Sequence, residues 1–271
     1  MTEAILPNAD PNTFTKINNS YYKDISRVWY EGKLINSADP KTFTPLTDPY
    51  SKDSTHIFYY GEIIPDADPK TFILSDDGYN KDGIHVWFYR VLIAGADPDT
   101  FTALGAKVGK DANHVYYYGD IIQGADPKTF ATIIDGIYYK DAYHVYFEGS
   151  ILPEADPKTF IFIADAYYKD VSHVWYWDKP LQGADPKTFT YIDYDYGKDA
   201  NQVYFQNNLI TADPKSFVGI KGDTAKDANN VYYVGQIVPN AIPTACTIND
   251  MTGCGNNSIH NNLQLTGQPT P

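Results

Sequence analysis

The chain has few cysteines, no long apolar run and fewer basic than acidic residues. Only two of its 271 residues are cysteine, which excludes the small secreted scaffolds that many disulfides hold together. No apolar run approaches the roughly 20 residues that cross a membrane as a helix, so the sequence predicts no membrane span. With 21 Lys and Arg against 34 Asp and Glu, the acidic field excludes nucleic acid as a partner.

The N-terminal residues also lack the features of a signal peptide. Residues 1–7 contain no basic segment and no long apolar stretch. If Met1 is a start residue added to a mature segment, the sequence favours a secreted or cell-surface location, and otherwise it favours the cytoplasm. The two cysteines, Cys246 and Cys254, lie in a polar C-terminal segment. They could close a small disulfide ring in an oxidising compartment or stay as free thiols, and both states remain open.

Aromatic residues and turn formers are abundant instead. The chain contains 24 Tyr, 13 Phe and 4 Trp, together with 18 Pro and 19 Gly. Aromatic side chains suit the pleated, half-buried surface of a sheet, and Pro and Gly spread along the chain mark many turns. The composition therefore predicts an all-β fold.

Three landmarks recur in register about every 29 residues, so the chain is a tandem array of eight repeats. The first landmark is the aspartate of an Asp-Pro pair, at positions 10, 39, 68, 97, 126, 156, 185 and 213. The second is the aspartate of a Lys-Asp pair, at positions 24, 53, 82, 111, 141, 170, 199 and 227. The third is a phenylalanine four residues after each Asp-Pro aspartate, from Phe14 to Phe217.

The repeat at residues 96–124 predicts a helical turn followed by strands. Asp97 suits the N-cap of one helical turn, and Pro98 suits its first position. Phe101 stands where a hydrophobic staple would hold that turn. A strand-like stretch follows, and residues 110–113 are typical of a loop in which Asp and Asn side chains bond to backbone.

The second half of the same repeat predicts a hairpin. Residues 114–117 form a strand, Tyr118 and Gly119 a tight turn, and residues 120–122 a returning strand. Each repeat is therefore a short β-meander closed by a helical turn. The first of these strands is apolar on both faces in every repeat, which implies that repeats stack on one another or that one aromatic face binds a partner.

The motifs at residues 111–117 and 125–130 resemble the DKNYY repeat family. That family's signature runs Asp-Lys-Asn-x-Val-Tyr-Tyr, a Gly turn, an apolar pair and Ala-Asp-Pro-x-Thr-Phe, and the resemblance covers residues 5–238. The chain departs from it at the second position, which is never Lys, and carries a Lys before each Asp instead. The resemblance implies repeat architecture and a bacterial origin. The family has no assigned function, so the resemblance implies no catalytic residues.

Two arrangements of the repeats fit the sequence, an open solenoid-like array and a β-propeller with short blades. About 29 residues is short for a four-stranded blade, and residues 5–9 echo residues 237–241, which leaves a ninth returning strand without a place in a ring. We therefore favour the open array. Residues 1–243 form the repeat domain, and the polar residues 244–271 form a tail or a cap over an array end, where unpaired strand edges invite self-association.

Two recurring polar positions invite a metal-binding interpretation. Five consecutive repeats place a histidine at strand entry: His56, His85, His114, His144 and His173. Imidazole suits transition metals and pH sensing, but Arg, Gln and Asn at this position in the other repeats favour a plain polar residue. The aspartates lack the closely spaced Asp-x-Asp pattern with Gly that calcium loops use. The sequence therefore predicts no metal and no cofactor, with the five histidines as the only candidate ligands.

The residue before the hairpin glycine varies between repeats and includes four large aromatics: Tyr60, Tyr89, Tyr118 and Trp177. Exposed aromatics at a varying position of a fixed scaffold suit a binding surface, and flat rings also suit sugars. The plainer interpretation is partial burial against the next repeat. These four residues are the candidate binding residues.

No enzyme motif is present, and histidines and carboxylates recur in phase, whereas a catalytic site needs a unique constellation. We therefore expect a non-catalytic repeat scaffold for protein-protein or cell-surface contacts. The alternatives are a carbohydrate-binding module that uses the exposed Tyr and Trp, and a structural subunit that self-assembles through the array ends. The partner, a protein or a glycan, is not identified by the sequence.

Overall fold

The computed structural model describes residues 6, 8–75, 77–133 and 136–246. The fold is all-β, with eight antiparallel sheets, one for each repeat. The chain divides into two compact units, Met1–Asp141 and Ala142–Pro271. We call these the N-terminal unit and the C-terminal unit, and we number the repeats 1 to 8 from their Asp-Pro aspartates.

The N-terminal unit consists of short strands of two to four residues. They are β1 (Thr15–Lys16), β2 (Tyr21–Lys23), β3 (Val28–Tyr30), β4 (Lys33–Leu34), β5 (Thr44–Pro45), β6 (Tyr50–Lys52), β7 (Ile57–Tyr59), β8 (Glu62–Ile63), β9 (Tyr79–Lys81), β10 (Val86–Phe88), β11 (Val91–Leu92), β12 (Thr102–Gly105), β13 (Val108–Lys110), β14 (Val115–Tyr117), β15 (Asp120–Ile121), β16 (Ala131–Thr132) and β17 (Tyr138–Lys140). Consecutive strands pair as meanders, such as β1-β2-β3-β4 and β12-β13-β14-β15. The sheet β9-β10-β11 has three strands, with a bridge between Ile73 and Lys81 where the others have a first strand.

The C-terminal unit continues the same pattern. Its elements are β18 (Val145–Phe147), β19 (Ser150–Ile151), β20 (Ile161–Ala164), β21 (Tyr167–Lys169), β22 (Val174–Tyr176), β23 (Lys179–Pro180), β24 (Thr190–Asp193), β25 (Tyr196–Lys198), β26 (Val203–Phe205), β27 (Asn208–Ile210), β28 (Val218–Lys221), β29 (Thr224–Lys226), β30 (Val231–Tyr233), β31 (Gln236–Ile237) and the 3-10 helix η1 (Pro243–Ala245). Its complete sheets are β20-β21-β22-β23, β24-β25-β26-β27 and β28-β29-β30-β31. In the described part of the chain, no helix is long and apolar enough to cross a membrane.

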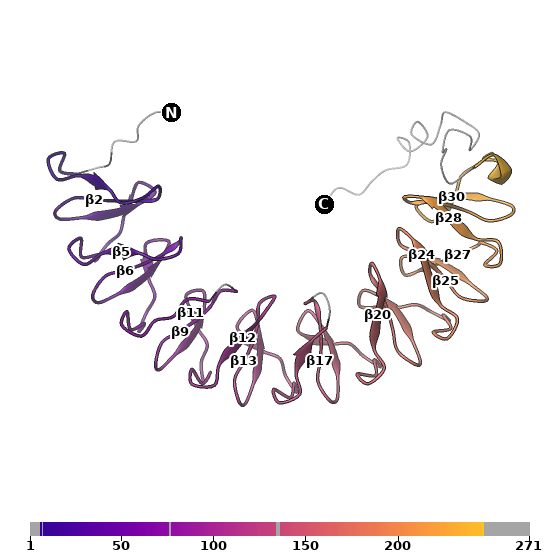
Figure 1. Cartoon of the computed structure of the whole chain (residues 1–271), viewed down its shortest axis with the longest axis horizontal. Helices are drawn as coiled ribbons and strands as arrows, with labels where there is room; N and C mark the ends of the chain where they lie inside the picture. Colours follow the sequence, from indigo (N-terminus) through magenta and orange to yellow (C-terminus); the bar gives the residue numbers. More distant parts are fainter. Residues whose placement is uncertain (1–5, 7, 76, 134–135, 247–271) are drawn as a thin grey trace. The chain divides into compact units, whose positions relative to one another are not determined.

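The predicted open, solenoid-like array is confirmed. Within each unit the sheets follow one another as separate small ribbons, and none closes into a barrel (Figure 1). About 29 residues accommodate four strands, because each strand is only two to four residues long. The sequence analysis placed Lys110 in a loop, but this residue ends β13, where it pairs with Val115.

The predicted hairpin turn is confirmed by its backbone angles. In repeat 4, Tyr118 has φ of 53° and Gly119 has φ of 88°. Positive φ at both central residues gives a turn whose twist matches that of the flanking strands. Where Arg90, Asp178 or Asn207 replaces the glycine, only the first of the two turn residues has positive φ, so glycine alone takes the left-handed region at the second position.

The Asp-Pro motif forms the predicted single turn. The backbone N–H of Phe43 donates to the carbonyl oxygen of Asp39 at 2.9 Å, an i to i+4 bond that is not continued. The Asp39 carboxylate caps this turn, since its Oδ1 accepts from the N–H of Lys41 at 3.0 Å and its Oδ2 from the hydroxyl of Thr42 at 2.9 Å. Asp is thus an N-cap here, as its position before Pro predicts.

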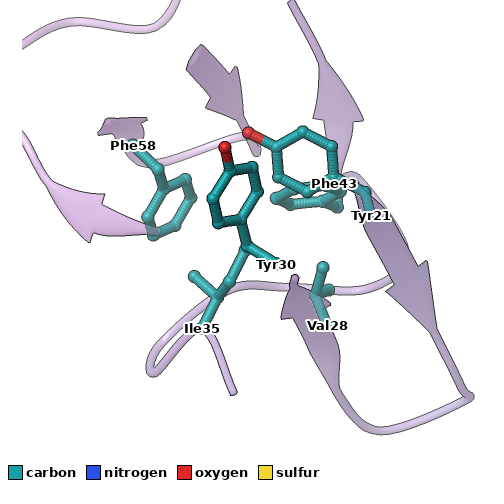
Figure 2. Close-up of a cluster of buried hydrophobic side chains, with 6 residues drawn as sticks. All are labelled: Tyr21, Val28, Tyr30, Ile35, Phe43 and Phe58. Carbon is teal, nitrogen blue, oxygen red and sulfur yellow. The ribbon is translucent and has the colours of Figure 1, made fainter. Parts of the chain in front are cut away.

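The hydrophobic core lies between consecutive sheets, not within one. Figure 2 shows one such cluster, in which repeat 1 supplies four side chains and repeat 2 supplies two: Tyr21, Val28, Tyr30, Ile35, Phe43 and Phe58. A matching cluster joins repeats 7 and 8, with Tyr196 and Val203 from one repeat and Phe217 and Tyr232 from the next. Stacking of consecutive repeats therefore buries the strands that are apolar on both faces. The pattern reflects packing between repeats rather than an aromatic face left open for a partner.

Candidate functional site

The second aspartate of each repeat is a structural group that uses its acceptors internally. In repeat 4 the buried Asp111 carboxylate accepts at Oδ1 from the backbone N–H groups of Asn113 at 2.8 Å and His114 at 2.7 Å. Its Oδ2 accepts from the N–H of Asp97 at 3.0 Å and from the hydroxyl of Tyr116 at 2.7 Å. Both oxygens are therefore committed to protein donors, and the carboxylate closes a loop.

The first aspartate is tied to the same loop through a threonine. The Thr100 hydroxyl donates to Oδ2 of Asp97 at 2.7 Å and accepts from the N–H of Ala112 at 3.0 Å. Among the residues that the structure describes, no group of three or more His, Cys, Asp or Glu side chains is placed to hold a metal ion. Through these hydrogen bonds the two aspartates hold the turn and the loop of the repeat together.

Each of the five histidines packs beside an aromatic residue of the strand that follows it in the same repeat. The ring centroids of His85 and Trp87 are 5.4 Å apart, and those of His173 and Trp175 are also 5.4 Å apart. The corresponding neighbours of the other three are Phe58 for His56, Tyr116 for His114 and Tyr146 for His144. The structure places these rings as separate strand-entry residues and not as a convergent cluster.

In seven repeats the lysine before the second aspartate reaches the turn that follows. In repeat 7, Nζ of Lys198 donates to the carbonyl oxygens of Pro214 and Phe217 in repeat 8, both at 2.9 Å. These carbonyls lie at the end of the Asp-Pro turn, where a cation is favourable. The same bridge to the following proline carbonyl recurs at Lys23, Lys52, Lys81, Lys110, Lys169 and Lys226.

We expect Lys198→Met to lower the free energy of unfolding by about 1.5–3 kcal/mol, because it keeps the apolar stem and removes two charge-assisted hydrogen bonds. Urea unfolding followed by fluorescence measures the loss. Lys215→Met is the control, since Lys215 is exposed in the turn that receives the bridge, and we expect a change within about 0.5 kcal/mol. Equal losses in the two variants would contradict the bridging role.

The hairpin aromatics of the N-terminal unit form a continuous seam with the strand aromatics beneath them. Ring centroids are 5.9 Å apart for Tyr30–Tyr60, 4.7 Å for Tyr60–Tyr59, 5.8 Å for Tyr59–Tyr89, 4.6 Å for Tyr89–Phe88, 5.7 Å for Phe88–Tyr118 and 4.7 Å for Tyr118–Tyr117. We call these seven residues the aromatic seam. Most of its ring pairs are T-shaped, which is a favourable geometry for aromatic contacts. The seam runs across repeats 1 to 4 at one end of their sheets.

The four predicted binding residues differ in how much of each side chain is exposed to solvent. Tyr60 and Tyr118 are 57% and 54% exposed. Tyr89 is half-buried: its ring lies against Gly78, and its hydroxyl accepts from Nζ of Lys107 at 3.1 Å. Trp177 belongs to the C-terminal unit, is 37% exposed and packs on Phe147 with ring centroids 6.3 Å apart. The structure thus brings three of the four candidates together and leaves Trp177 outside the seam.

Burial raises the pKa values of two strand tyrosines of the seam, Tyr30 and Tyr59. Burial, with a smaller effect from the nearby carboxylates of Asp48 and Glu31, raises the pKa of Tyr30 to about 12. Burial is also the largest cause of the raised pKa of Tyr59. These phenols stay neutral at physiological pH, so the seam offers rings and hydroxyls rather than charge.

Two grooves lie between consecutive repeats beside the hairpins. One, of about 500 Å³, separates β11 from the β14–β15 hairpin and is lined by Phe88, Val91, Leu92, Tyr118 and Ile121, among others. The second, of about 300 Å³, lies in the C-terminal unit between β19 and the hairpin that contains Asp178. The aliphatic side chains of the lining come from the apolar pair that follows each hairpin in the sequence, a signal that could have predicted the grooves.

Cys246 occupies the place of the recurring phenylalanine at the end of the last described turn. It is fully buried against Ile220 and Val231, and its carbonyl oxygen accepts from Nζ of Lys226 at 2.6 Å. Residues 244–246 therefore complete the packing of repeat 8, three residues beyond the boundary drawn at 243. The other predicted disulfide partner, Cys254, lies outside the described residues, so the bridge stays a prediction.

The fold and the seam define a tandem β-repeat protein whose surface varies at its hairpins. The sequence model described as the DKNYY family matches residues 21–136, 130–179 and 167–214, which together span more than half of the chain. The chain belongs to the DKNYY family. No curated protein and no solved structure matches it.

Proposed function

We propose that the chain is a non-catalytic repeat scaffold that binds protein partners through the hairpin ends of its repeats. The aromatic seam carries this proposal, because Tyr60 and Tyr118 stay more than half exposed while they pack on strand aromatics. A ring on a rigid support loses little conformational entropy on binding, which makes it an efficient anchor.

The recurring polar groups have structural roles, which favours a non-catalytic function. Asp111 is committed to loop closure, and Lys110 donates to the carbonyl of Pro127 in the next repeat at 2.8 Å. The described histidines are spread over five repeats. A catalytic site needs convergent groups at one unique place, and the repeating arrangement favours a supporting role instead.

Carbohydrate binding is the second candidate, and one observation favours it. Tyr118 and Trp177 each expose an aromatic ring close in sequence to a carboxylate, Asp120 or Asp178. Rings and carboxylates together suit sugars. We favour a protein partner, because Val91, Leu92 and Ile121 gather as exposed aliphatic side chains in the groove beside Tyr118, and covering them removes apolar surface from water.

Panning of a random peptide library on the whole chain tests the proposal, with a glycan array run in parallel. The seam variant is Tyr60→Asn with Tyr118→Asn, since Asn tolerates the positive φ of both positions. The control is Tyr143→Asn, which removes a 70% exposed ring from the loop at the opposite end of the strands. We expect enriched peptides that bind the chain and the control equally and bind the seam variant at least tenfold more weakly.

Three outcomes would overturn the proposal. Peptides that bind the seam variant as well as the unchanged chain would remove the seam from recognition. Glycan binding that the seam variant loses, without any peptide enrichment, would favour the carbohydrate alternative. Concentration-dependent association of the unchanged chain in light scattering, with no ligand of either class, would favour the self-assembling subunit.

A further inference from the structure

The two inter-repeat grooves have the same construction, although they lie in different units of the chain. Each has a phenylalanine at its base, Phe88 in one and Phe147 in the other. Each is walled by the returning strand of one repeat and by the hairpin of the next repeat. Recurrence of one groove at equivalent places indicates that the repeat itself builds the feature.

Exposed aliphatic side chains line part of each groove, beside polar residues. Val91 is 67% exposed, Leu92 46% and Ile121 39% in the larger groove, and Ile151 is 44% exposed in the smaller one. Large aliphatic side chains gathered in a concave place favour an apolar occupant, because covering them removes apolar surface from water. Volumes of about 500 and 300 Å³ suit a few side chains of an extended segment rather than a folded domain.

The charged residues that line the grooves are all acidic. Asp120 stands at the larger groove, and Glu148 and Asp178 stand at the smaller one, where Asp178 also pairs with Lys179 at 2.8 Å. No lysine or arginine is among the described lining residues of either groove. The chain as a whole carries a net charge of −13. Carboxylates around an apolar cleft complement a ligand that joins apolar and basic side chains.

The strands that wall the grooves are edge strands. Among the described strands, β11 pairs with β10 alone and β19 with β18 alone. An edge strand presents backbone N–H and C=O groups that a second, extended chain can pair with. The preferred occupant is therefore extended as well as apolar and basic.

We propose that the inter-repeat grooves bind extended polypeptide segments that combine aliphatic and basic residues. The aliphatic side chains occupy the groove, the basic side chains meet the carboxylates at its rim, and the backbone lies along the edge strand. This inference rests on the proposed protein-binding function and adds the chemistry of the partner. The specificity residues of the larger groove are then Val91, Asp120 and Ile121.

The test uses a dye-labelled six-residue peptide of alternating isoleucine and lysine, measured by fluorescence anisotropy with the whole chain. Its comparison peptides replace lysine by glutamate or isoleucine by serine. The groove variant combines Val91→Ser with Asp120→Lys. Repeat 5 carries Ser150 and repeat 1 carries Lys33 at the equivalent position, so both substitutions use residues that the fold already accepts there.

The control variant combines Ile84→Ser with Asp99→Lys, which changes a 71% exposed isoleucine and an exposed aspartate outside the groove. We expect the isoleucine–lysine peptide to bind the chain and the control alike, to bind the groove variant at least tenfold more weakly, and to weaken as salt rises. Both comparison peptides are expected to bind at least tenfold more weakly than the isoleucine–lysine peptide.

Failure of this inference is distinguishable from failure of the proposed function. If library peptides bind through the seam but the isoleucine–lysine peptide does not bind, the groove chemistry is wrong and the scaffold function stands. If the glutamate peptide binds as tightly as the lysine peptide, the carboxylates do not select the partner and the inference is overturned. If no peptide of any composition binds, both proposals fail.

Discussion

Phe217→Ala is expected to lower the free energy of unfolding by about 3–5 kcal/mol, the range for removing a buried aromatic ring. Phe217 is only 1% exposed. Its ring centroid lies 5.4 Å from that of Tyr196 in repeat 7 and 5.5 Å from that of Tyr232 in repeat 8. The ring therefore fills the space between two sheets, and its loss leaves a cavity at a junction of the array. Urea unfolding followed by intrinsic fluorescence measures the effect.

The chain contains a matched control for this variant. Phe14 holds the same place in repeat 1, but it is 36% exposed, and its two aromatic neighbours in the described structure, Tyr22 and Trp29, belong to its own repeat. The hydrophobic contribution scales with the apolar area buried. Phe14→Ala should therefore cost clearly less than Phe217→Ala. Equal losses would mean that burial within a repeat, and not stacking between repeats, accounts for the conserved position of the ring along the array.

Local structure was predictable wherever one repeat contains all the residues that form it. Asp39 caps its own turn three residues away, and Gly119 lies in the hairpin that it shapes. Both signals are short in sequence, so capping and turn preferences identify them. Eight copies in register then identified the array. The single strand-like stretch predicted after the turn is two strands, β12 and β13. β13 was not predicted separately, because it is three residues long and contains Gly109.

Contacts between repeats were not predictable, because no local preference encodes them. Lys198 was recognised as recurring, but its partners at Pro214 and Phe217 become visible only when the next turn is placed beside it. The aromatic seam likewise needs Tyr59 to touch Tyr89 across a repeat junction. The sequence showed that Tyr60, Tyr89 and Tyr118 occupy one varying position. Only the structure shows that they join through strand aromatics and that Lys107 covers part of one of them.

The buried aspartates make the stability of the array dependent on pH. Burial alone would raise the pKa of Asp111, but hydrogen bonds from the N–H of Asp97, the hydroxyl of Tyr116 and two loop N–H groups outweigh it and hold the pKa below its ordinary value. The same balance, with burial opposed by hydrogen bonds, lowers the pKa of Asp24, Asp53 and Asp227. A carboxylate whose pKa is lowered by hydrogen bonds stabilises the fold only while it is ionised.

We expect the free energy of unfolding to fall steeply as the pH drops below about 5. An unfolded aspartate takes up its proton near pH 3.9, whereas the folded carboxylates protonate only at lower pH. Below about pH 5 the unfolded state therefore binds more protons than the folded state. Stability is fully present above that window and is lost as the pH falls through the folded pKa values. Because Asp24, Asp53, Asp111 and Asp227 lie in four different repeats, their losses add along the array.

Urea unfolding at a series of pH values between 7 and 2 measures this dependence. Asp111→Asn should lower the free energy of unfolding at pH 7 by about 1.5–3 kcal/mol, since it removes hydrogen bonds to a charged group. It should also make the decline toward low pH shallower, because one titrating carboxylate is gone. Asp99→Asn, at an exposed position, should leave both the value at pH 7 and the decline unchanged. A free energy of unfolding that stays level from pH 6 to pH 2 would show that the aspartate network does not stabilise the array as a set of ionised carboxylates.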